Sequence, residues 1–160
     1  MAEIIVNTSP LQYLHQAGQL DLLPKLFGQV IVPDSVLAEL AAGRQRGISL
    51  PQPEMLNWIK VQSAIRPINS LASRDLGAGE LAVLALAMEL PGSWVILDDK
   101  LARQAAIHLN LSLLGTAGIL LRAKRAGYLP TIRPVLDRFN SLGFRLTPET
   151  MRSILELAEE

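Results

Sequence analysis

The chain has 160 residues, of which 49% are hydrophobic and 19% are charged, and its formal net charge is zero. This length fits one domain with its own apolar core, and this composition excludes a disordered chain. Cysteine is absent, which excludes disulfides, thiolate chemistry and zinc sites built on cysteine. No apolar run approaches the roughly 18 residues of a membrane-spanning helix and no signal peptide is recognisable, so we expect a cytoplasmic protein.

Short apolar segments alternate with longer segments of helical pattern as far as about residue 130. The expected strands are EIIV at 3–6, QVIVP at 29–33, SWVIL at 93–97 and LSLL at 111–114. The expected helices include SVLAELAA at 35–42, ELAVLALAMEL at 80–90, KLARQAAIHL at 100–109 and TAGILLRAKRAG at 116–127. The last of these is expected to be capped by Thr116. Strands this apolar, separated by helices, predict a mostly parallel central sheet covered on both faces, in a three-layer α/β/α sandwich.

Beyond about residue 130 the pattern is helical only, in the segments TIRPVLDRFNSLG and TPETMRSILELAEE. We therefore expect residues 1–130 to form the α/β domain. Residues 131–160 are expected to form a C-terminal helical extension that packs on the same domain and does not fold as a second one.

The basic residues are concentrated in the second half of the chain. Between positions 100 and 145 a single acid, Asp137, accompanies the basic residues Lys100, Arg103, Arg122, Lys124, Arg125, Arg133, Arg138 and Arg145. Such a run is most often a set of solvated helix faces, and the alternative is a surface that binds phosphates.

Polar residues that directly follow two of the expected strands are candidates for function, because ligands of parallel sheets bind beyond the carboxyl ends of the strands. Asn7, Thr8 and Ser9 follow the first strand, and Asp98 and Asp99 follow SWVIL. One aspartate can serve simply as the N-cap of the next helix. A second adjacent carboxylate is repelled by the first unless a cation relieves the repulsion, which favours a metal site.

Two glutamates are the other candidates. Glu39 flanks the apolar stripe of its helix, and Glu80 opens a helix that is apolar around most of its circumference. The structural alternative to a functional role is, for Glu39, that it is a surface glutamate. For Glu80 it is that the residue is a first-turn acid stabilised by the helix dipole. Hard oxygen ligands without a histidine cluster indicate Mg²⁺ or Mn²⁺.

The segment GAGELA at 77–82 matches a dinucleotide-binding fingerprint, and the two aspartates follow it at about the spacing of a ribose-binding acid. That fingerprint must directly follow a strand, and the preceding INSLASRDL is polar and broken. We therefore rank a dinucleotide site below the interpretation that follows.

Four motifs in order carry a resemblance to a known family: VNTSP, PDSVLAEL with Glu39, GAGELAVLALA with Glu80, and VILDDKLARQAA. Over nearly its whole length the chain resembles PIN domains, in particular a prokaryotic PIN-like branch related to the toxin nucleases. The resemblance implies an acidic cluster that holds one or two Mg²⁺ or Mn²⁺ ions and activates water for phosphodiester cleavage, usually of RNA. It places Asn7 at the family's first aspartate, Glu39 and Glu80 at its next two acids, and Asp99 at its last, with Asp98 as an alternative ligand.

With RNA as the implied substrate, the phosphate-binding interpretation of the basic residues becomes the favoured one. The expected RNA-binding residues are Thr8, Ser9, Lys100, Arg103, Arg122, Lys124 and Arg125. The resemblance further implies a homodimer and a small antitoxin protein as partner.

Asn7 departs from the family pattern. An amide oxygen can coordinate a hard cation, but it carries no charge and cannot accept a proton from water. Two functions therefore remain: a Mg²⁺- or Mn²⁺-dependent ribonuclease, attenuated by Asn7 and a candidate toxin of a toxin-antitoxin pair, or a catalytically silent PIN-like module that binds RNA or a protein.

Overall fold

The computed structural model describes residues 2–68 and 75–160, and the strands within them form one parallel sheet in the order β3-β2-β1-β4-β5. The strands are β1 (Ile4–Val6), β2 (Val30–Val32), β3 (Ile59–Val61), β4 (Trp94–Ile96) and β5 (Ser112–Leu114). All four expected strands are present. The sequence did not predict β3, because it lies at the sheet edge, is partly exposed and has a lysine at its centre, so no apolar run marks it.

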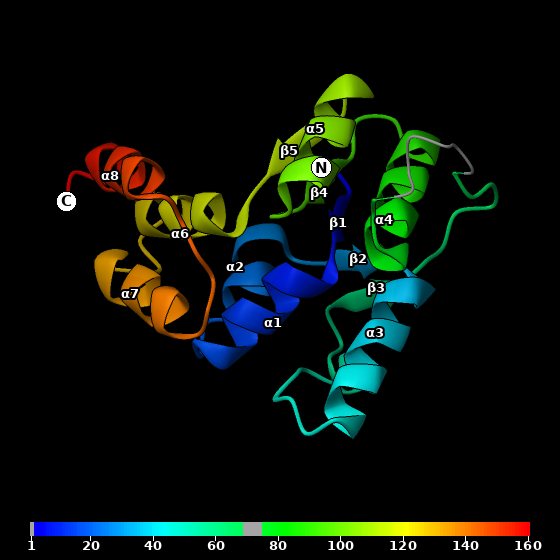
Figure 1. Ribbon diagram of the computed structural model, residues 1–160, viewed down its shortest axis with the longest axis horizontal. Coiled ribbons are helices and arrows are strands. Elements are labelled where there is room, and N and C mark those ends of the chain that lie inside the picture. The colour runs from blue at the N-terminus through cyan, green and yellow to red at the C-terminus, as the bar shows by residue number, and fades with distance from the viewer. Residues whose placement is uncertain (1, 69–74) are drawn as a thin grey trace.

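Helices cover both faces of the sheet, which confirms the expected α/β/α sandwich (Figure 1). They are α1 (Thr8–Gln16), α2 (Leu22–Phe27), α3 (Asp34–Gln45), α4 (Ala78–Glu89), α5 (Lys100–His108), α6 (Thr116–Arg125), α7 (Arg133–Ser141) and α8 (Pro148–Leu157), with a 3₁₀ turn at Pro53–Met55. Helix α4 contacts β1 and β4 and also α3, whereas α2 contacts β2 and α6. None of the helices in the described ranges is both long enough and apolar enough to span a bilayer.

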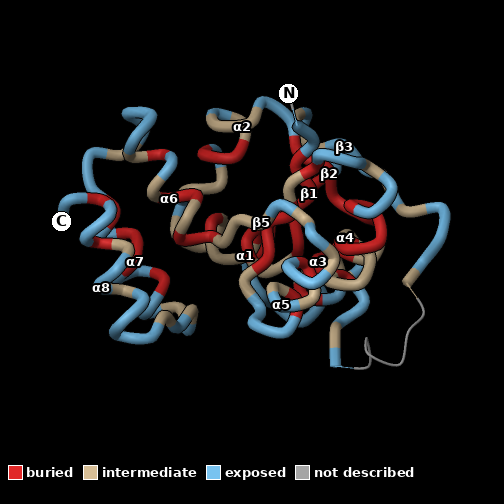
Figure 2. Tube along the Cα trace, turned by 90° about the horizontal axis from the view of Figure 1, so that it is seen from above, coloured by how far each residue is buried: buried red, intermediate tan, exposed pale blue. Residues whose placement is uncertain are grey.

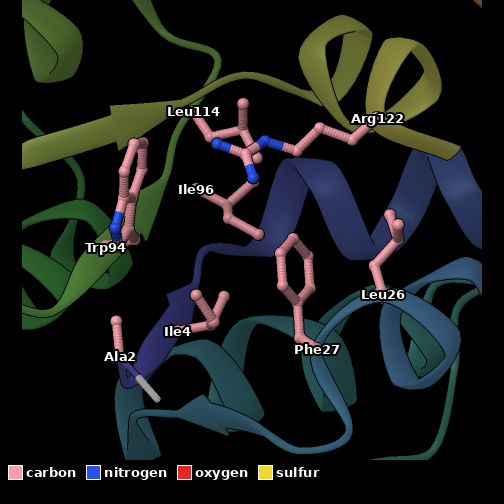
Figure 3. Close-up of a pocket in the computed structure, with 8 residues that line it drawn as sticks. All are labelled: Ala2, Ile4, Leu26, Phe27, Trp94, Ile96, Leu114 and Arg122. Carbon is pink, nitrogen blue, oxygen red and sulfur yellow. The ribbon is translucent and has the colours of Figure 1, made fainter. Parts of the chain in front are cut away.

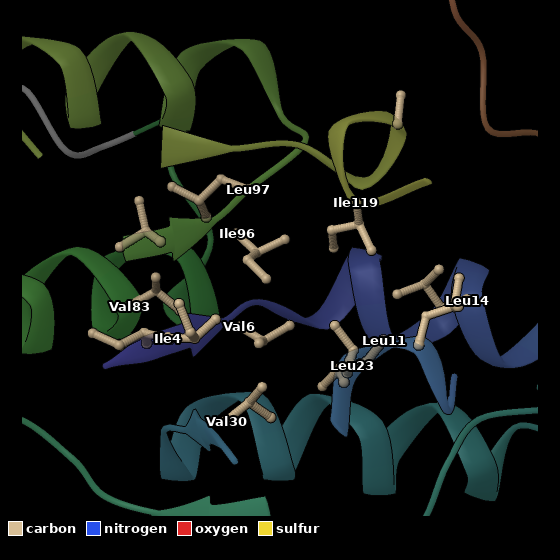
Figure 4. Close-up of a cluster of buried hydrophobic side chains, with 14 of the residues drawn as sticks. Ile4, Val6, Leu11, Leu14, Leu23, Val30, Val83, Ile96, Leu97 and Ile119 are labelled. Carbon is tan, nitrogen blue, oxygen red and sulfur yellow. The ribbon is translucent and has the colours of Figure 1, made fainter. Parts of the chain in front are cut away.

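The core is built on the inner strands β1, β2 and β4. Ile5 and Val6 of β1 and Val95 and Ile96 of β4 are fully buried. Figure 4 shows how side chains from both helical layers, such as Val83 of α4, point toward them. Seen from above, the inner strands of the sheet are buried and the outer turns of the helices are exposed (Figure 2). A strand covered on both faces needs apolar residues at every position, which explains why the sequence shows unbroken apolar runs here.

The sheet order places its topological switch point between β1 and β4. The chain continues from β1 to β2 on one side, and from β4 to β5 on the other. Asn7 directly follows β1, and its backbone N–H donates to the Ile96 carbonyl of β4 at 3.2 Å. The residues that follow β1 and β4 therefore lie side by side, at the position where open α/β sheets bind ligands.

The helices after residue 130 pack on the α/β domain through α6 and α1. Helix α8 contacts α6, and Phe139 of α7 lies 6.4 Å from the ring of Tyr13 of α1. Lys124 of α6 donates to the Ala158 carbonyl and to Glu160. In Figure 1, α7 and α8 accordingly lie beside α6, on the side away from α4.

The Glu160→Gln substitution is expected to destabilise the protein at neutral pH. The Glu160 carboxylate accepts from the backbone N–H of Ile132 at 2.8 Å and of Arg133 at 3.1 Å, and from Lys124 at 3.0 Å. The N–H of Ile132 and the other donors lower the pKa of Glu160 below its ordinary value, so its stabilisation is present at neutral pH and is lost as the pH falls through the lowered pKa. Urea unfolding at several pH values measures this difference.

Glu156→Gln is the control, because it removes the same charge from an exposed position of α8. A loss of stability in Glu156→Gln equal to that in Glu160→Gln would show that net charge, and not the hydrogen bonds at residues 132 and 133, sets the effect.

Candidate active site

A cleft of about 580 Å³ opens at the carboxyl ends of β1 and β4. Its lining includes all five predicted metal ligands, together with other residues of α1 and of the turn after α7. The lining residues are Asn7, Thr8, Ser9, Gln12, Tyr13, Glu39, Glu80, Asp98, Asp99, Gly143, Phe144 and Arg145. The fold thus brings together side chains that are more than 90 positions apart in the sequence.

Asn7 places a buried side-chain amide in this site. It is 5% exposed, and its Oδ1 is buried without a hydrogen-bond partner among the described residues. Asn7 stands at the N-cap position of α1, yet its side chain makes no capping hydrogen bond. Capping of α1 therefore does not account for an amide at this position, although a buried polar atom without a partner is unfavourable by about 1–3 kcal/mol.

Glu39 of α3 is fixed by two hydrogen bonds. Its Oε2 accepts from the Thr8 hydroxyl at 3.0 Å, and its Oε1 accepts from the backbone N–H of Gly79 at 2.7 Å. A Cβ added at Gly79 would lie 2.3 Å from Glu39 Oε1 and 3.1 Å from Asn7 Oδ1. The second glycine of GAGELA therefore leaves room for the close approach of these two oxygens to the first turn of α4.

Glu80 lies at the start of α4, beside Asp99. Its Oε1 accepts from the backbone N–H of Gly77 at 3.0 Å, whereas its Oε2 is buried and has no partner among the described residues. Burial raises the pKa of Glu80, and the negative charges of Asp99 and Glu39 raise it further. Two ionised carboxylates only accept hydrogen bonds and repel each other, so Glu80 and Asp99 need a proton or a cation between them.

The two adjacent aspartates have different surroundings. Asp99 is the N-cap of α5 and accepts from the N–H of Ala102 at 3.0 Å. Asp98 accepts from the backbone N–H of Thr116 at 2.8 Å and from its hydroxyl at 2.5 Å. Burial raises the pKa of Asp98, although the donors of Thr116 and the nearby Arg103 oppose the shift. Asp98 is thus tied to α6, and Asp99 is the one that approaches Glu80.

Thr116 does not cap α6 as the sequence predicted. The N-cap of α6 is Gly115, and Thr116 is the first helical residue. Its hydroxyl donates to Asp98 and so is turned away from the helix end. A threonine cap was a reasonable expectation from local sequence, but a tertiary partner 18 positions earlier takes the hydroxyl.

The donor set fits a hard divalent cation. Mg²⁺ and Mn²⁺ bind amide and carboxylate oxygens. The site offers two buried oxygens that have no hydrogen-bond partner within residues 2–68 and 75–160, Asn7 Oδ1 and Glu80 Oε2, and the nearby Asp99 carboxylate. In the present side-chain conformations, no three His, Asp or Glu side chains of residues 2–68 and 75–160 are arranged so that they could hold one ion. Glu39, Glu80 and Asp98 each accept from backbone N–H groups, which accounts for their orientations.

The Gly79→Ala substitution is expected to reduce metal affinity by roughly ten- to a hundredfold, the size of effect found when the support of a metal ligand is lost. The new methyl group would overlap Glu39 Oε1 and crowd Asn7 Oδ1, so Glu39 must move. Calorimetric titration with Mn²⁺ measures the affinity. In a helix without such an overlap, Gly→Ala stabilises the protein by about 0.5–1 kcal/mol. A variant that is more stable and has unchanged metal affinity would therefore show that the methyl group does not displace Glu39.

Five of the seven predicted RNA-binding residues do not line this cleft, and three of these five, Arg122, Lys124 and Arg125, lie on α6. The guanidinium of Arg122 lies 5.2 Å from the ring of Trp94 and lines a separate apolar hollow of about 190 Å³ (Figure 3). That hollow runs along β1, β4 and β5, because its lining includes Ile4, Trp94, Ile96 and Leu114, and it shares no lining residue with the cleft. Lys124 is paired with Glu160, and Arg125 is exposed at the end of α6.

The remaining predicted RNA-binding residues are nearer to the acids. Thr8 and Ser9 line the cleft. Lys100 is the exposed first residue of α5, and Arg103 donates to the Leu97 carbonyl at 2.9 Å. The cation that lines the cleft itself, Arg145, was not among the predicted site residues, and neither were Gln12, Tyr13 and Phe144. Arg145 belongs to the basic run of the sequence, but only its position after α7 distinguishes it.

The structure does not support a dinucleotide site at GAGELA. Gly77 is the N-cap of α4, and the described residues between β3 and this helix, 62–68 and 75–76, contain no strand. Most of the INSLASRDL segment lies outside the described residues. The helix start that would bind a pyrophosphate instead has its N–H groups bonded to Glu39 and Glu80.

Comparison with known proteins identifies a family. A family model described as DUF3368, a PIN domain, matches residues 3–160. No curated protein matches the chain. The match covers the sheet, the acidic cleft and the helices after residue 130.

Proposed function

Since the chain belongs to the PIN domain family, whose members are generally nucleases, we propose that it is a metal-dependent ribonuclease that hydrolyses phosphodiester bonds in the acidic cleft. The observation that carries the proposal is a pair of buried oxygens that have no hydrogen-bond partner in the described part of the chain, Asn7 Oδ1 and Glu80 Oε2, which belong to residues of the same cleft. A hard cation is the ligand that would satisfy both and would also relieve the repulsion between Glu80 and Asp99.

The residues that would hold Mg²⁺ or Mn²⁺ are Asn7, Glu80 and Asp99, with Glu39 beside them. Once bound, such an ion supplies an activated water and neutralises charge on the phosphate. Thr8 and Gly79 hold Glu39 in place by their hydrogen bonds. Thr116 does the same for Asp98, which joins the end of β4 to the start of α6. The Ser9 hydroxyl, at the cleft surface, can donate to a phosphate oxygen.

Asn7 is the specific observation that favours a second function, a PIN-like module that binds RNA or a protein without cutting it. At the position of the first family acid it supplies no charge, which weakens both metal binding and activation of water. A small antitoxin as partner and assembly into a homodimer are further predictions that follow from the family resemblance. Sedimentation of the purified protein tests the homodimer directly.

The deciding experiment is incubation of end-labelled single-stranded RNA with the protein in Mg²⁺, in Mn²⁺ and in EDTA. Metal-dependent cleavage that is lost in Glu80→Gln would support the ribonuclease. RNA binding without cleavage, both by the wild type and by Asn7→Asp, would support the silent module.

A further inference from the structure

The segment that joins β4 to α5, residues 97–99, contains both adjacent aspartates. Its backbone is held at both ends: the N–H of Leu97 donates to the Leu114 carbonyl at 3.1 Å, and the Asp99 carbonyl accepts from the N–H of Arg103 at 2.9 Å. Asp99 has an extended backbone, with φ −61° and ψ 133°, and neighbouring side chains of an extended segment point to opposite sides. The two carboxylates therefore face different layers of the fold.

Asp98 faces α6, where one residue uses both of its oxygens. Its Oδ1 accepts from the backbone N–H of Thr116 at 2.8 Å, and its Oδ2 accepts from the Thr116 hydroxyl at 2.5 Å. Thr116 is fully buried, so these hydrogen bonds are shielded from water, which strengthens them. The pair connects the end of β4 to the first turn of α6.

Arg103 of α5 closes this connection from the other side. Its Nη1 donates to the Leu97 carbonyl at 2.9 Å, directly before Asp98. A Cβ at Gly115 would lie 2.7 Å from the same nitrogen and 3.5 Å from Asp98 Oδ1, so glycine leaves the space in which the guanidinium lies beside the carboxylate. The positive charge of Arg103 offsets the negative charge of Asp98. Repulsion between the adjacent aspartates is therefore reduced by a side chain of the protein itself.

Asp99 faces the opposite way, toward α4. It is exposed in the cleft and stands beside Glu80, and its Oδ2 accepts from the N–H of Ala102 at 3.0 Å. In Figure 1, α4 and α6 lie on opposite sides of β1. An Asp98 side chain held toward α6 thus leaves Asp99 directed toward α4.

On the basis of the proposed metal-dependent ribonuclease, we propose that Asp98, Thr116 and Arg103 are positioning residues for the metal ligand Asp99, and that Asp98 does not itself bind the ion. The hydrogen bonds of Thr116 fix residues 97–99 against α6, so that the Asp99 carboxylate stands beside Glu80 before an ion arrives. A ligand that is already in place loses less freedom on binding, which increases the affinity.

The test is calorimetric titration with Mn²⁺ of variants that separate the charge of Asp98 from its hydrogen bonds. Asp98→Asn removes the charge but keeps both contacts, because the amide can accept from the Thr116 N–H and donate to its hydroxyl oxygen. Asp98→Ala removes the contacts as well. We expect Asp98→Ala and Thr116→Val to weaken Mn²⁺ binding by roughly ten- to a hundredfold, as the loss of a ligand's support does. Asp98→Asn should weaken it far less than Asp98→Ala, and far less than Asp99→Asn.

A second measurement uses the metal-free protein. Asp99 accepts from the N–H of Ala102, so hydrogen exchange of that amide, followed by NMR, reports whether Asp99 keeps its place. Exchange should be faster in Thr116→Val and should return to the wild-type rate in Thr116→Ser, which keeps the hydroxyl. Unchanged exchange in Thr116→Val would overturn the proposal.

Thr147→Val is the control, because it removes the same hydroxyl from the start of a helix that does not line the cleft. The Thr147 hydroxyl accepts from the N–H of Thr150 at 3.1 Å and caps α8. This variant should lose stability, as Thr116→Val does, but should keep the Mn²⁺ affinity of the wild type. An equal loss of affinity in both variants would show that lost stability, and not the position of Asp99, sets the effect, which would also overturn the proposal.

The two proposals fail in different ways. A wild type that binds no Mn²⁺ would refute the metal-dependent ribonuclease, and exchange at Ala102 would then decide whether Thr116 positions Asp99. Mn²⁺ binding that is weakened as strongly by Asp98→Asn as by Asp99→Asn would support the metal site and refute the different roles of the two aspartates.

Discussion

Replacing Glu80 with glutamine is expected to reduce metal-dependent RNA cleavage by about a hundredfold or more, as the loss of a charged ligand implies. The same change should make the metal-free protein slightly more stable. Glutamine keeps the acceptor for the N–H of Gly77, so the helix start is preserved. Burial first, and then Asp99 and Glu39, raise the pKa of Glu80, which means that its negative charge is unfavourable without a cation. After solvent screening we expect a gain of up to about 1 kcal/mol in the free energy of unfolding.

Glu89→Gln is the matched control, at the other end of the same helix. The N–H groups of Arg66 and Ile65 lower the pKa of Glu89, so this carboxylate stabilises the protein at neutral pH and loses that effect as the pH falls. For Glu80 the sign is opposite: the raised pKa means that stability decreases as the pH rises above the ordinary glutamate value of 4.5. At neutral pH, Glu80→Gln should therefore stabilise and Glu89→Gln should destabilise.

Thermal unfolding with and without Mn²⁺, together with cleavage of labelled RNA, measures both effects. Manganese should raise the melting temperature of the wild type and of Glu89→Gln but not that of Glu80→Gln. Equal protection of all three proteins by manganese would place the ion elsewhere, and the acidic cleft would then not be the metal site.

The sheet was largely predictable because its central strands are buried on both faces. Ile4 to Val6 and Trp94 to Ile96 belong to apolar runs that turn residues interrupt, and such runs are typical of parallel sheets. Ile59 to Val61 contains a lysine at an exposed edge, so the same rule gives no signal there. The order of the strands follows from pairings distant in sequence, such as Ile5 with Val95, which local patterns do not contain.

The meeting of polar residues in the cleft was predictable for a different reason. Asn7 and the two aspartates come at the ends of apolar runs, and parallel strands carry the residues that follow them to one edge of the sheet. The distinction between Asp98 and Asp99 was not predictable, because it depends on the Thr116 hydrogen bonds to the first of them. Arg145 could not be found in advance, since its place at the cleft depends on the packing of Phe139 and Phe144 against Tyr13.

Asn7→Asp is expected to increase metal affinity by about tenfold or more and to accelerate RNA cleavage. At about 4 Å and an effective dielectric near 20, a new carboxylate attracts the cation by several kcal/mol before desolvation and repulsion from the other acids are subtracted. A net gain of roughly 1–2 kcal/mol corresponds to that increase in affinity. The carboxylate can also accept a proton from the attacking water, which the amide cannot.

Without metal the same variant should be less stable than the wild type. Asn7 is 5% exposed and its Oδ1 has no hydrogen-bond donor among the described residues, so a charge placed there is desolvated and lies near Glu39, whose Oε1 approaches the same point beside Gly79. We expect a loss of about 1–3 kcal/mol in the free energy of unfolding, which Mn²⁺ should restore.

Asn57→Asp is the control, because it adds the same charge at an exposed position that precedes β3 and does not line the cleft. It should change neither metal affinity nor cleavage. Calorimetric titration with Mn²⁺, thermal unfolding in EDTA and RNA cleavage are measured on both variants. An Asn7→Asp protein that equals the wild type in all three would mean that the amide oxygen does not face the cation, and the nuclease proposal would lose the residue that stands at the junction of β1 and β4.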